Sequence, residues 1–260
     1  MHDSAFAFGK LFFNTYAGDK KKLIILDIGS QDVNGSLRSL APKNSNYIGV
    51  DFENGKGVDI VIDDPYKLPF DTNSADIIVS SSCFEHSNFF WLVFIECLRV
   101  LKPCGILYIN APSNGIFHRY PIDSWRFYPD AGLSLESFGK RSGYNCALLE
   151  SFIDSRNNEI WNDFVAVFIK DQNDVESYKS RMLNKLKHYT NAHLFGTNEI
   201  FHFSGLSPEL ITRLSHESEI QRLNKIITDL KSSRSVLGWE IMVLTKRIKF
   251  LVKKFISFFQ

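Results

Sequence analysis

The stretch Leu26-Asp27-Ile28-Gly29-Ser30-Gln31-Asp32-Val33-Asn34-Gly35 decides the fold of this chain. It follows a short apolar run at residues 23–25, which three lysines precede and which predicts a buried parallel strand. The strand ends in an acidic residue, a glycine comes two residues later, and polar residues follow. That order predicts a tight reversal in which a ligand can approach the backbone closely.

A second predicted strand, at residues 47–50, ends in Asp51, which lies 24 residues after Asp27. A doubly wound sheet presents a carboxylate to ribose hydroxyls at about this distance along the chain. The two strand ends therefore predict a nucleoside-bearing cofactor that lies across them.

Length and composition set limits on the class of protein. A chain of 260 residues can hold one substantial α/β domain and an appendage. Because 30 basic residues nearly balance 29 acidic ones, we expect no nucleic-acid partner. The four cysteines lack metal-ligand spacing, so we expect free thiols in a reducing compartment. We expect no secretion signal and no membrane span, since no uncharged run reaches about 18 residues. These features predict a cytoplasmic protein.

Apolar runs of strand length alternate with helical stretches, which predicts a mostly parallel sheet covered on both faces. The last two predicted strands are joined by a polar run without a helix, so we expect an antiparallel pair at one sheet edge. The expected fold class is therefore α/β, with a Rossmann-like sheet of seven strands. The predicted strands are residues 23–26, 47–50, 58–62, 75–80, 105–110, 147–153 and 164–170. The predicted helices are residues 3–17, which we expect over the cofactor cleft or the sheet, 35–40, 89–101 and 133–143.

Several motifs in this order and spacing resemble the class I S-adenosylmethionine-dependent methyltransferases. The motifs are the opening stretch, Asp51, Asp64-Pro65-Tyr66-Lys67-Leu68-Pro69-Phe70, Ala75-Asp76-Ile77-Ile78-Val79, Phe84-Glu85-His86 and Leu98-Arg99-Val100-Leu101-Lys102-Pro103. The resemblance covers about residues 24–170. It implies S-adenosylmethionine as the cofactor and a sheet of five parallel strands with an antiparallel pair.

The resemblance also implies roles for particular residues. Asp51 would hold the cofactor ribose, and Asp64, or Asp63 in its place, would meet the adenine amino group. The implied cofactor-binding residues are Asp27, Gly29, Ser30, Gln31, Asp51, Phe52, Asp63, Asp64, Ser81 and Ser82.

Two departures from the family pattern stand out. The usual second glycine of the first motif is replaced, because Gly29 is followed by Ser30-Gln31-Asp32, and bulk at this turn limits how near a cofactor can sit. The usual Lys-Pro-Gly-Gly is Lys102-Pro103-Cys104-Gly105, which we interpret as a packing change. The chain lacks G-x-G-x-x-G and the phosphate-cradling G-x-x-x-x-G-K-[ST], which argues against a nicotinamide dehydrogenase.

The long aromatic segment at residues 110–130 is the expected acceptor loop, since ligand-binding residues collect beyond the carboxyl ends of strands. Its composition suits a polyhydroxylated ring, with aromatic faces for stacking and charged groups for hydroxyls or a phosphate. The alternative to ligand binding by Arg119 and Arg126 is an ion pair with Asp123 or Asp130. The predicted substrate-binding residues are Arg119, Tyr120, Trp125 and Arg126.

A hydroxyl acceptor needs a base within hydrogen-bond reach. We predict His118 for this role, assisted by Asp123, because imidazole titrates near neutrality. The alternative is that His118 and Asp123 only tie down the loop. His86, just after the fourth strand, is a further catalytic candidate, and its alternative is a packed histidine beside the cofactor. We expect no metal site, although a carboxylate site built from residues distant in sequence stays open.

The composition changes near residue 207. We expect a methyltransferase domain over residues 1–172, a helical connector over 173–215 and an amphipathic basic tail over 216–260. Heptads place isoleucine at most a positions and leucine at d positions, which predicts a coiled coil and a homo-oligomer. Ser232-Ser233 and Gly238 are the places where we expect this helix to be interrupted or kinked. One alternative is a long helix packed on the chain's own domain. Five basic and no acidic side chains in residues 241–260 also suit an anionic membrane surface or a partner protein.

The acceptor loop and the basic tail together resemble methyltransferases of bacterial surface-polysaccharide assembly. That resemblance implies a saccharide acceptor, a sugar hydroxyl of an O-antigen or capsule precursor, methylated at the inner face of the plasma membrane. Methylation of a small metabolite is the first alternative. A non-catalytic methyltransferase fold that scaffolds a glycan assembly complex is the second.

Overall fold

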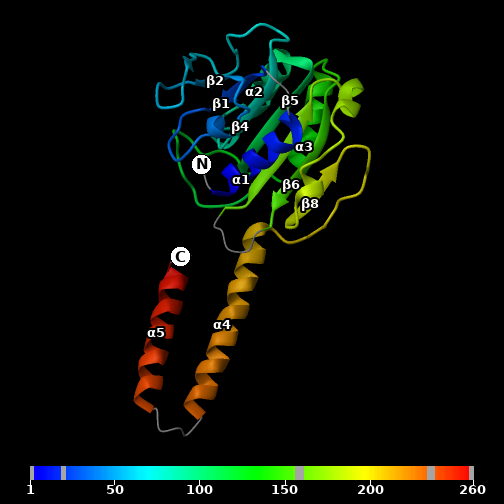
Figure 1. The fold of residues 1–260 in the computed structure, drawn as a ribbon. Coiled ribbons are helices and arrows are strands. Elements are labelled where there is room, and N and C mark those ends of the chain that lie inside the picture. Colours follow the sequence, from blue (N-terminus) through cyan, green and yellow to red (C-terminus); the bar gives the residue numbers. More distant parts are fainter. Residues whose placement is uncertain (1–2, 19–21, 156–160, 233–237, 258–260) are drawn as a thin grey trace. The chain divides into compact units, whose positions relative to one another are not determined.

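The computed structural model describes residues 3–18, 22–155, 161–232 and 238–257. Two compact units divide the chain, Met1–Gly205 and Leu206–Gln260. The boundary between them falls inside the predicted connector. Figure 1 shows the fold of each unit.

The described part of the first unit contains one sheet of eight strands in the order β3-β2-β1-β4-β5-β7-β6-β8. The first five of these strands are parallel, and β7, β6 and β8 join them through antiparallel pairings. The predicted α/β class and the parallel core are therefore confirmed. The strands are β1 (Ile24–Ile28), β2 (Asn46–Asp51), β3 (Ile60–Val61), β4 (Ala75–Ser81), β5 (Leu101–Pro112), β6 (Ala147–Asp154), β7 (Asp163–Ile169) and β8 (Tyr189–Leu194).

The prediction of seven strands with β6 and β7 at the edge is wrong by one strand. β8 pairs with β6 and forms the edge instead. Its residues are half-buried apart from Ala192, which is fully buried. A strand of this kind has no continuous apolar run, and its pattern of tyrosine, threonine, asparagine and histidine resembles a loop.

Helices cover both faces of the sheet. On one face, α1 buries Phe8 and Phe12 in a cluster with the side chains of Ile25 and Tyr108, so the first helix lies over the sheet. On the other face, α2 and α3 pack in a cluster with Leu26. The helical elements of this unit are α1 (Asp3–Phe12), η1 (Phe13–Ala17), η2 (Leu37–Leu40), η3 (Phe84–His86), α2 (Phe90–Val100), α3 (Asp130–Arg141), η4 (Gln172–Ser177) and η5 (Leu183–Lys185).

Strict alternation in the central strands explains why both faces are covered. In β5, Ile106 and Tyr108 enter one core while Leu107 and Ile109 enter the other. Successive side chains of a strand point to opposite faces, so a strand that is apolar at every position needs a helix on each side. The sequence could show this because β1, β4, β5 and β7 each contain an uninterrupted apolar run, at residues 24–26, 77–79, 106–109 and 164–169.

A buried carboxylate ties η1 to the segment at Met182 and Leu183. Glu150 of β6 is fully buried and accepts hydrogen bonds from the backbone N–H groups of Met182 (2.8 Å) and Leu183 (2.9 Å). The phenol of Tyr16 also donates to it. Burial raises the pKa of the Glu150 carboxyl. These contacts compensate its desolvation, since a buried polar group is costly unless it is hydrogen-bonded.

We predict that Glu150→Gln lowers the free energy of unfolding by about 1–3 kcal/mol, because the amide NH₂ would face a backbone N–H and leave it without an acceptor. Urea denaturation at pH 7 measures the loss. Glu136→Gln is the matched control, because Glu136 forms only an i,i+4 pair with Lys140 on a helix surface, and about 0.5 kcal/mol or less is expected there. Equal losses in the two variants would contradict the role assigned to Glu150.

In the described part of the second unit, the helices α4 (Pro208–Ser232) and α5 (Gly238–Ser257) run antiparallel (Figure 1). The rings of His216 and Phe255 meet at 4.4 Å between centroids. Of the predicted heptad positions, Ile227 is buried, whereas Leu244 and Leu251 are exposed. The predicted coiled coil is not confirmed, whereas the expected interruption agrees with the end of α4 at Ser232 and the start of α5 at Gly238. Association of the helices with a second copy stays a prediction.

No helix among the described residues has both the length and the apolar character that crossing a membrane would require.

Candidate cofactor and acceptor site

The reversal after β1 depends on a glycine. Gly29 has a φ of +79°, a conformation that side chains other than glycine rarely adopt. A β-carbon at this position would lie 2.5 Å from Cβ of Cys83. The N–H groups of Gly29 and Ser30 both donate to the carbonyl oxygen of Val50, at 2.9 and 3.2 Å. The turn therefore brings the ends of β1, β2 and the segment after β4 into contact.

Asp51 ends β2 beside this turn and is almost fully buried. Its carboxylate accepts hydrogen bonds from the N–H groups of Gln31 (3.0 Å), Phe52 (2.8 Å) and Glu53 (3.3 Å). These bonds fix the carboxylate at the carboxyl ends of the parallel strands, where ligands of open α/β sheets bind. Phe52 exposes 44% of its surface next to it, so an apolar face is available to a ligand.

Asp27, by contrast, is held inside the protein. Its carboxylate accepts a hydrogen bond of 2.7 Å from the phenol of Tyr47, and burial raises the pKa of Asp27 to about 6. Ser30 is also buried, and its hydroxyl oxygen lies against Gly49 of β2. These two predicted cofactor residues therefore support the turn from within.

The remaining predicted cofactor residues follow β3 and β4. Asp64 accepts a hydrogen bond from the N–H of Tyr66 (2.9 Å) and so organises its own turn, while Asp63 is exposed. Ser82 has a φ of +53° and donates its N–H to the carbonyl oxygen of Asn110. The hydroxyl oxygen of Ser81 is buried and has no hydrogen-bond partner among the described residues. An unsatisfied hydroxyl at the end of β4 suits a polar ligand there.

The acceptor loop is fastened to the segment after β4. The N–H of Ser124 donates to the carbonyl oxygen of Glu85 (2.8 Å), and the indole N–H of Trp125 donates to the carbonyl oxygen of Ser87 (2.8 Å). The phenol of Tyr120 donates to the side-chain oxygen of Gln31. The predicted substrate loop and the predicted cofactor turn are therefore in direct contact.

Charges within the loop are largely used by the loop itself. Asp123 forms a two-point ion pair with Arg126 at 2.6 and 2.8 Å, and this guanidinium lowers the pKa of Asp123 to about 2. The N–H of His118 also donates to Asp123 (2.7 Å). Arg119, in contrast, is exposed. Of the pairings considered from the sequence, Arg126 with Asp123 is the one the structure contains, and Asp130 pairs with His193 instead.

The two candidate catalytic histidines lie together. Their rings are 5.0 Å apart between centroids and meet edge to face. The Nδ1 of His86 bonds the carbonyl oxygen of Ile122, and the Nδ1 of His118 bonds that of Ile116 at 3.2 Å. A carbonyl oxygen can only accept, so each Nδ1 carries a proton and each Nε2 keeps its lone pair. Both histidines can therefore act as bases or ligands through Nε2.

Two further residues complete this part of the site and were not predicted to have a role. Glu85 is fully buried, and burial raises its pKa to about 8. Trp161 packs edge to face on the ring of His118 at 4.9 Å between centroids. The sequence could have indicated a role for Glu85, because it directly precedes His86. No local sequence pattern connects Trp161 with a loop some forty residues earlier.

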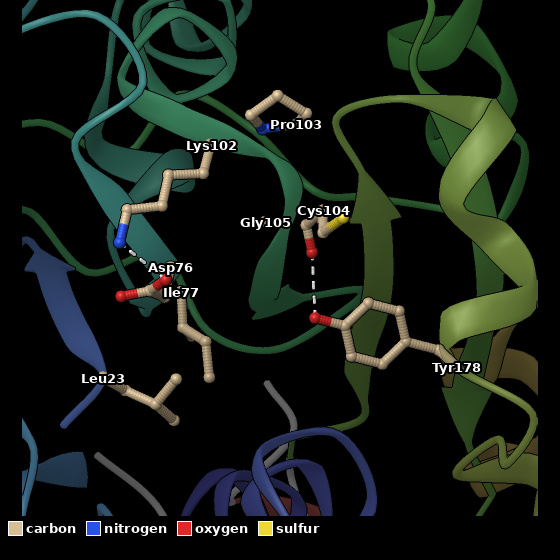
Figure 2. Close-up of a pocket in the computed structure, with 8 residues that line it drawn as sticks. All are labelled: Leu23, Asp76, Ile77, Lys102, Pro103, Cys104, Gly105 and Tyr178. Atoms are coloured by element: carbon tan, nitrogen blue, oxygen red, sulfur yellow. Dashed lines mark hydrogen bonds and ion pairs between the residues drawn. The ribbon is translucent and has the colours of Figure 1, made fainter. Parts of the chain in front are cut away.

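A cavity of about 320 Å³ lies at the opposite end of the sheet, beside the first residues of β1, β4 and β5 (Figure 2). The ion pair between Lys102 and Asp76 (2.7 Å) and the hydrogen bond from Tyr178 to the carbonyl oxygen of Cys104 (2.9 Å) close two of its sides. Because ligands of this fold bind at the carboxyl ends of the strands, the cavity is not the cofactor site. Its lining residues are Leu23, Asp76, Ile77, Lys102, Pro103, Cys104, Gly105 and Tyr178.

Residues 26–109 match the family model described as a methyltransferase domain. No curated protein sequence matches the chain. Similar solved structures include the YcgJ protein of Bacillus subtilis, with 12% identity and a TM-score of 0.45 over 64% of this chain and 99% of that one. A 1,6-didemethyltoxoflavin-N1-methyltransferase of Burkholderia thailandensis, with bound S-adenosylhomocysteine, has 13% identity and a TM-score of 0.49 over 65% and 80%. A methyltransferase of Aquifex aeolicus has 14% identity and a TM-score of 0.43 over 64% and 89%.

The matched segment begins at the turn after β1 and ends in β5, so it contains the parallel core and the cofactor edge. Residues 26–109 therefore carry a methyltransferase domain, set in a Rossmann-like α/β sheet. The chain is thus an enzyme, a methyltransferase, and S-adenosylmethionine is its methyl donor.

The residues at the carboxyl edge fit this cofactor. The carboxylate of Asp51 is fixed for a ribose, the ring of Phe52 is exposed for an adenine face, and the buried hydroxyl of Ser81 lacks a partner. When bound, S-adenosylmethionine supplies an electrophilic methyl group on a sulfonium. The predicted acceptor loop meets the same edge through the hydrogen bond from Tyr120 to Gln31.

We predict that Gly29→Ala weakens S-adenosylmethionine binding and destabilises the protein by more than Gly35→Ala does. Gly35 also has a positive φ, of +117°, but a β-carbon there meets nothing within 4 Å. The Gly35 variant should therefore show only backbone strain, roughly 1–3 kcal/mol, and Gly29→Ala should add the collision with Cys83. Urea denaturation and calorimetric titration measure the two effects, and equal behaviour of the variants would refute the close approach.

Because Asp27 is buried, we predict that the free energy of unfolding depends on pH. Because its folded pKa of about 6 lies above the ordinary aspartate pKa of about 3.9, its contribution is fully present below about pH 4 and is lost as the pH rises through 6. Asp27→Asn removes this titration. Between pH 4 and pH 7 the variant should gain about 3 kcal/mol relative to the wild type, which denaturation curves at the two pH values measure. A constant difference between the proteins would contradict the burial of a titrating carboxyl.

Proposed function

We propose that this methyltransferase acts on a sugar hydroxyl of a bacterial surface glycan or its precursor. The observation that carries the proposal is the acceptor loop, which offers an exposed arginine, Arg119, and two partly exposed aromatic rings, Tyr120 and Trp125, beside the cofactor turn. Aromatic faces and a guanidinium are the groups that suit a saccharide carrying a phosphate. The precursor we favour is therefore a phosphate-linked sugar.

The chemistry requires a deprotonated acceptor in line with the methyl group. His118 serves as the general base through Nε2, since its Nδ1 hydrogen and its backbone N–H are held by Ile116 and Asp123. Arg126 keeps Asp123 ionised and so fixes the loop that carries the histidine. The acceptor oxygen forms its bond to the methyl carbon while the carbon–sulfur bond breaks.

The test is turnover with defined acceptors. The purified chain and methyl-labelled S-adenosylmethionine should methylate a nucleotide-linked or lipid-linked saccharide and release S-adenosylhomocysteine in equal amount. Arg119→Ala should raise KM for such an acceptor by about 10–100-fold, because a charge-assisted bond to phosphate is lost. Arg141→Ala, an exposed arginine at the end of α3, is the control. Turnover only with small non-sugar metabolites would instead support the alternative substrate class.

The C-terminal helices are proposed to join two or more copies of the chain. The exposed Leu244, Leu251 and Phe255 support this, since an apolar face of this kind is costly in water. Contact with a glycan-assembly protein or an anionic membrane surface at the cell's inner face would use the same helix with its basic side chains.

We predict that Leu244→Glu combined with Leu251→Glu converts the oligomer into monomers without changing the sheet domain. Analytical ultracentrifugation of the full chain gives the mass, and S-adenosylmethionine binding checks the sheet domain. Lys246→Glu with Lys253→Glu is the control for added charge on the same helix. A monomeric wild type, or an unchanged mass of the leucine variant, would rule out this interface.

A further inference from the structure

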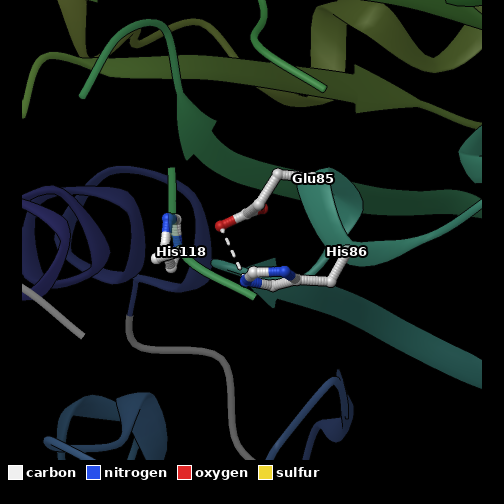
Figure 3. Close-up of side chains that lie close together, drawn as sticks. All are labelled: Glu85, His86 and His118. Carbon is white, nitrogen blue, oxygen red and sulfur yellow. Dashed lines mark ion pairs between the residues drawn. The ribbon is translucent and has the colours of Figure 1, made fainter. Parts of the chain in front are cut away.

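Three side chains from two separate segments meet beside the acceptor loop. Glu85 and His86 come from η3, and His118 comes from the loop 32 residues later; Figure 3 shows the three side chains turned toward one another. One nitrogen or oxygen atom of each residue lies within 4.8 Å of the others. Two imidazoles and one carboxylate form a donor set that divalent transition metals use in proteins.

We propose that Glu85, His86 and His118 bind one divalent transition-metal ion, with zinc or manganese as the ions of choice, at the acceptor end of the site. The distance between Nε2 of His86 and Oε1 of Glu85 is 3.7 Å. This distance is too long for a hydrogen bond. Two atoms that bind one ion at about 2.1 Å lie roughly 3.0–3.5 Å apart, so a small side-chain movement brings both onto an ion.

Neighbouring groups already orient the two imidazoles as ligands. Metal-binding histidines nearly always donate their second ring N–H to a carbonyl or carboxylate oxygen, which leaves the other nitrogen for the ion. His86 donates from Nδ1 to the Ile122 carbonyl, and His118 donates from Nδ1 to the Ile116 carbonyl with Asp123 3.3 Å away. The lone pairs of both histidines are therefore at Nε2, as a shared ion requires.

Glu85 supplies an independent indication of a missing partner. Its side chain is 1% exposed, and its Oε2 has no hydrogen-bond partner among the described residues. A buried carboxylate oxygen without a partner is costly, and a bound cation would remove that cost. The carboxylates of Asp123 and Asp163 also act on Glu85 and add negative charge, while Arg126 offsets part of it. His118 leaves 34% of its side chain exposed and so gives an ion access from solvent.

The role of the ion rests on the proposed function. A sugar hydroxyl bound to the metal would lose its proton to solvent more readily, because a divalent cation lowers the pKa of a bound hydroxyl. The acceptor oxygen would then attack the methyl carbon as the carbon–sulfur bond breaks and the sulfonium becomes a neutral thioether. With the ion bound, Nε2 of His118 is a metal ligand and cannot also accept the acceptor's proton, so the general-base role given above to His118 applies to the protein without the ion.

The experiment measures metal binding apart from methyl transfer. The full-length protein is freed of metal with a chelator and titrated with Zn²⁺ and with Mn²⁺ by calorimetry, and the bound metal is then quantified. We expect one ion per chain, and we expect Glu85→Gln and His118→Asn each to weaken binding at least about 10–100-fold. His193→Ala is the matched control, because this histidine pairs with Asp130 outside the cluster.

Circular dichroism checks that each variant is folded. Because the His118 side chain is partly exposed, we expect His118→Asn to fold even if Glu85→Gln does not. Absence of binding by the wild type, or binding that neither variant weakens, would overturn the metal site. If the protein binds metal through these residues but methylates no saccharide, the metal site is supported and the proposed substrate is wrong. If the protein freed of metal methylates a saccharide at full rate, the proposed substrate is supported and the role given to the metal is wrong.

Discussion

The position of β1 between β2 and β4 is the constraint on which the site depends. Asp27 of β1 stands opposite Gly49 of β2 and Val79 of β4, so all three strands end at one edge of the sheet. At that edge the chain reverses at Gly29, and only a residue without a side chain allows the approach to Cys83. The fixed carboxylate of Asp51 and the segment that carries Glu85 and His86 follow from this geometry.

The loop predicted to bind the acceptor is attached directly to the segments that form the predicted cofactor site. The loop after β5 is bonded to η3 through Ser124 and to the turn after β1 through Tyr120. Much of its charge is neutralised internally, because Arg126 and Asp123 pair with each other. Under the proposed function, few groups are left to recognise an acceptor, chiefly Arg119, the two histidines and the exposed aromatic rings. A loop fixed in this way positions an acceptor at little entropic cost.

The central strands could be predicted because β4, β5 and β7 are apolar on both faces, a pattern that needs no tertiary information. β8 could not, since an edge strand such as Tyr189–Leu194 is half-buried and polar. Contacts between residues far apart in the sequence could not be predicted either, because no local sequence pattern marks them. Examples are the hydrogen bonds of Glu150 with Met182 and Leu183, and the proximity of Glu85 to His118. In the tail, the heptads predicted helices, and Ser232 and Gly238 indicated where one helix ends and the next begins, but the heptads did not give the antiparallel arrangement of α4 and α5.

The central claim is that the edge formed by β1, β2 and β4 binds S-adenosylmethionine through Asp51. Calorimetric titration of the full chain with S-adenosylhomocysteine tests it most directly, with Asp51→Asn beside the wild type and Asp71→Asn as the control for a surface carboxylate. The account predicts saturable binding of one molecule per chain by the wild type and the control, and binding weaker by about 10–100-fold for Asp51→Asn. No binding by the wild type at millimolar concentration, or equal binding by all three proteins, would contradict it.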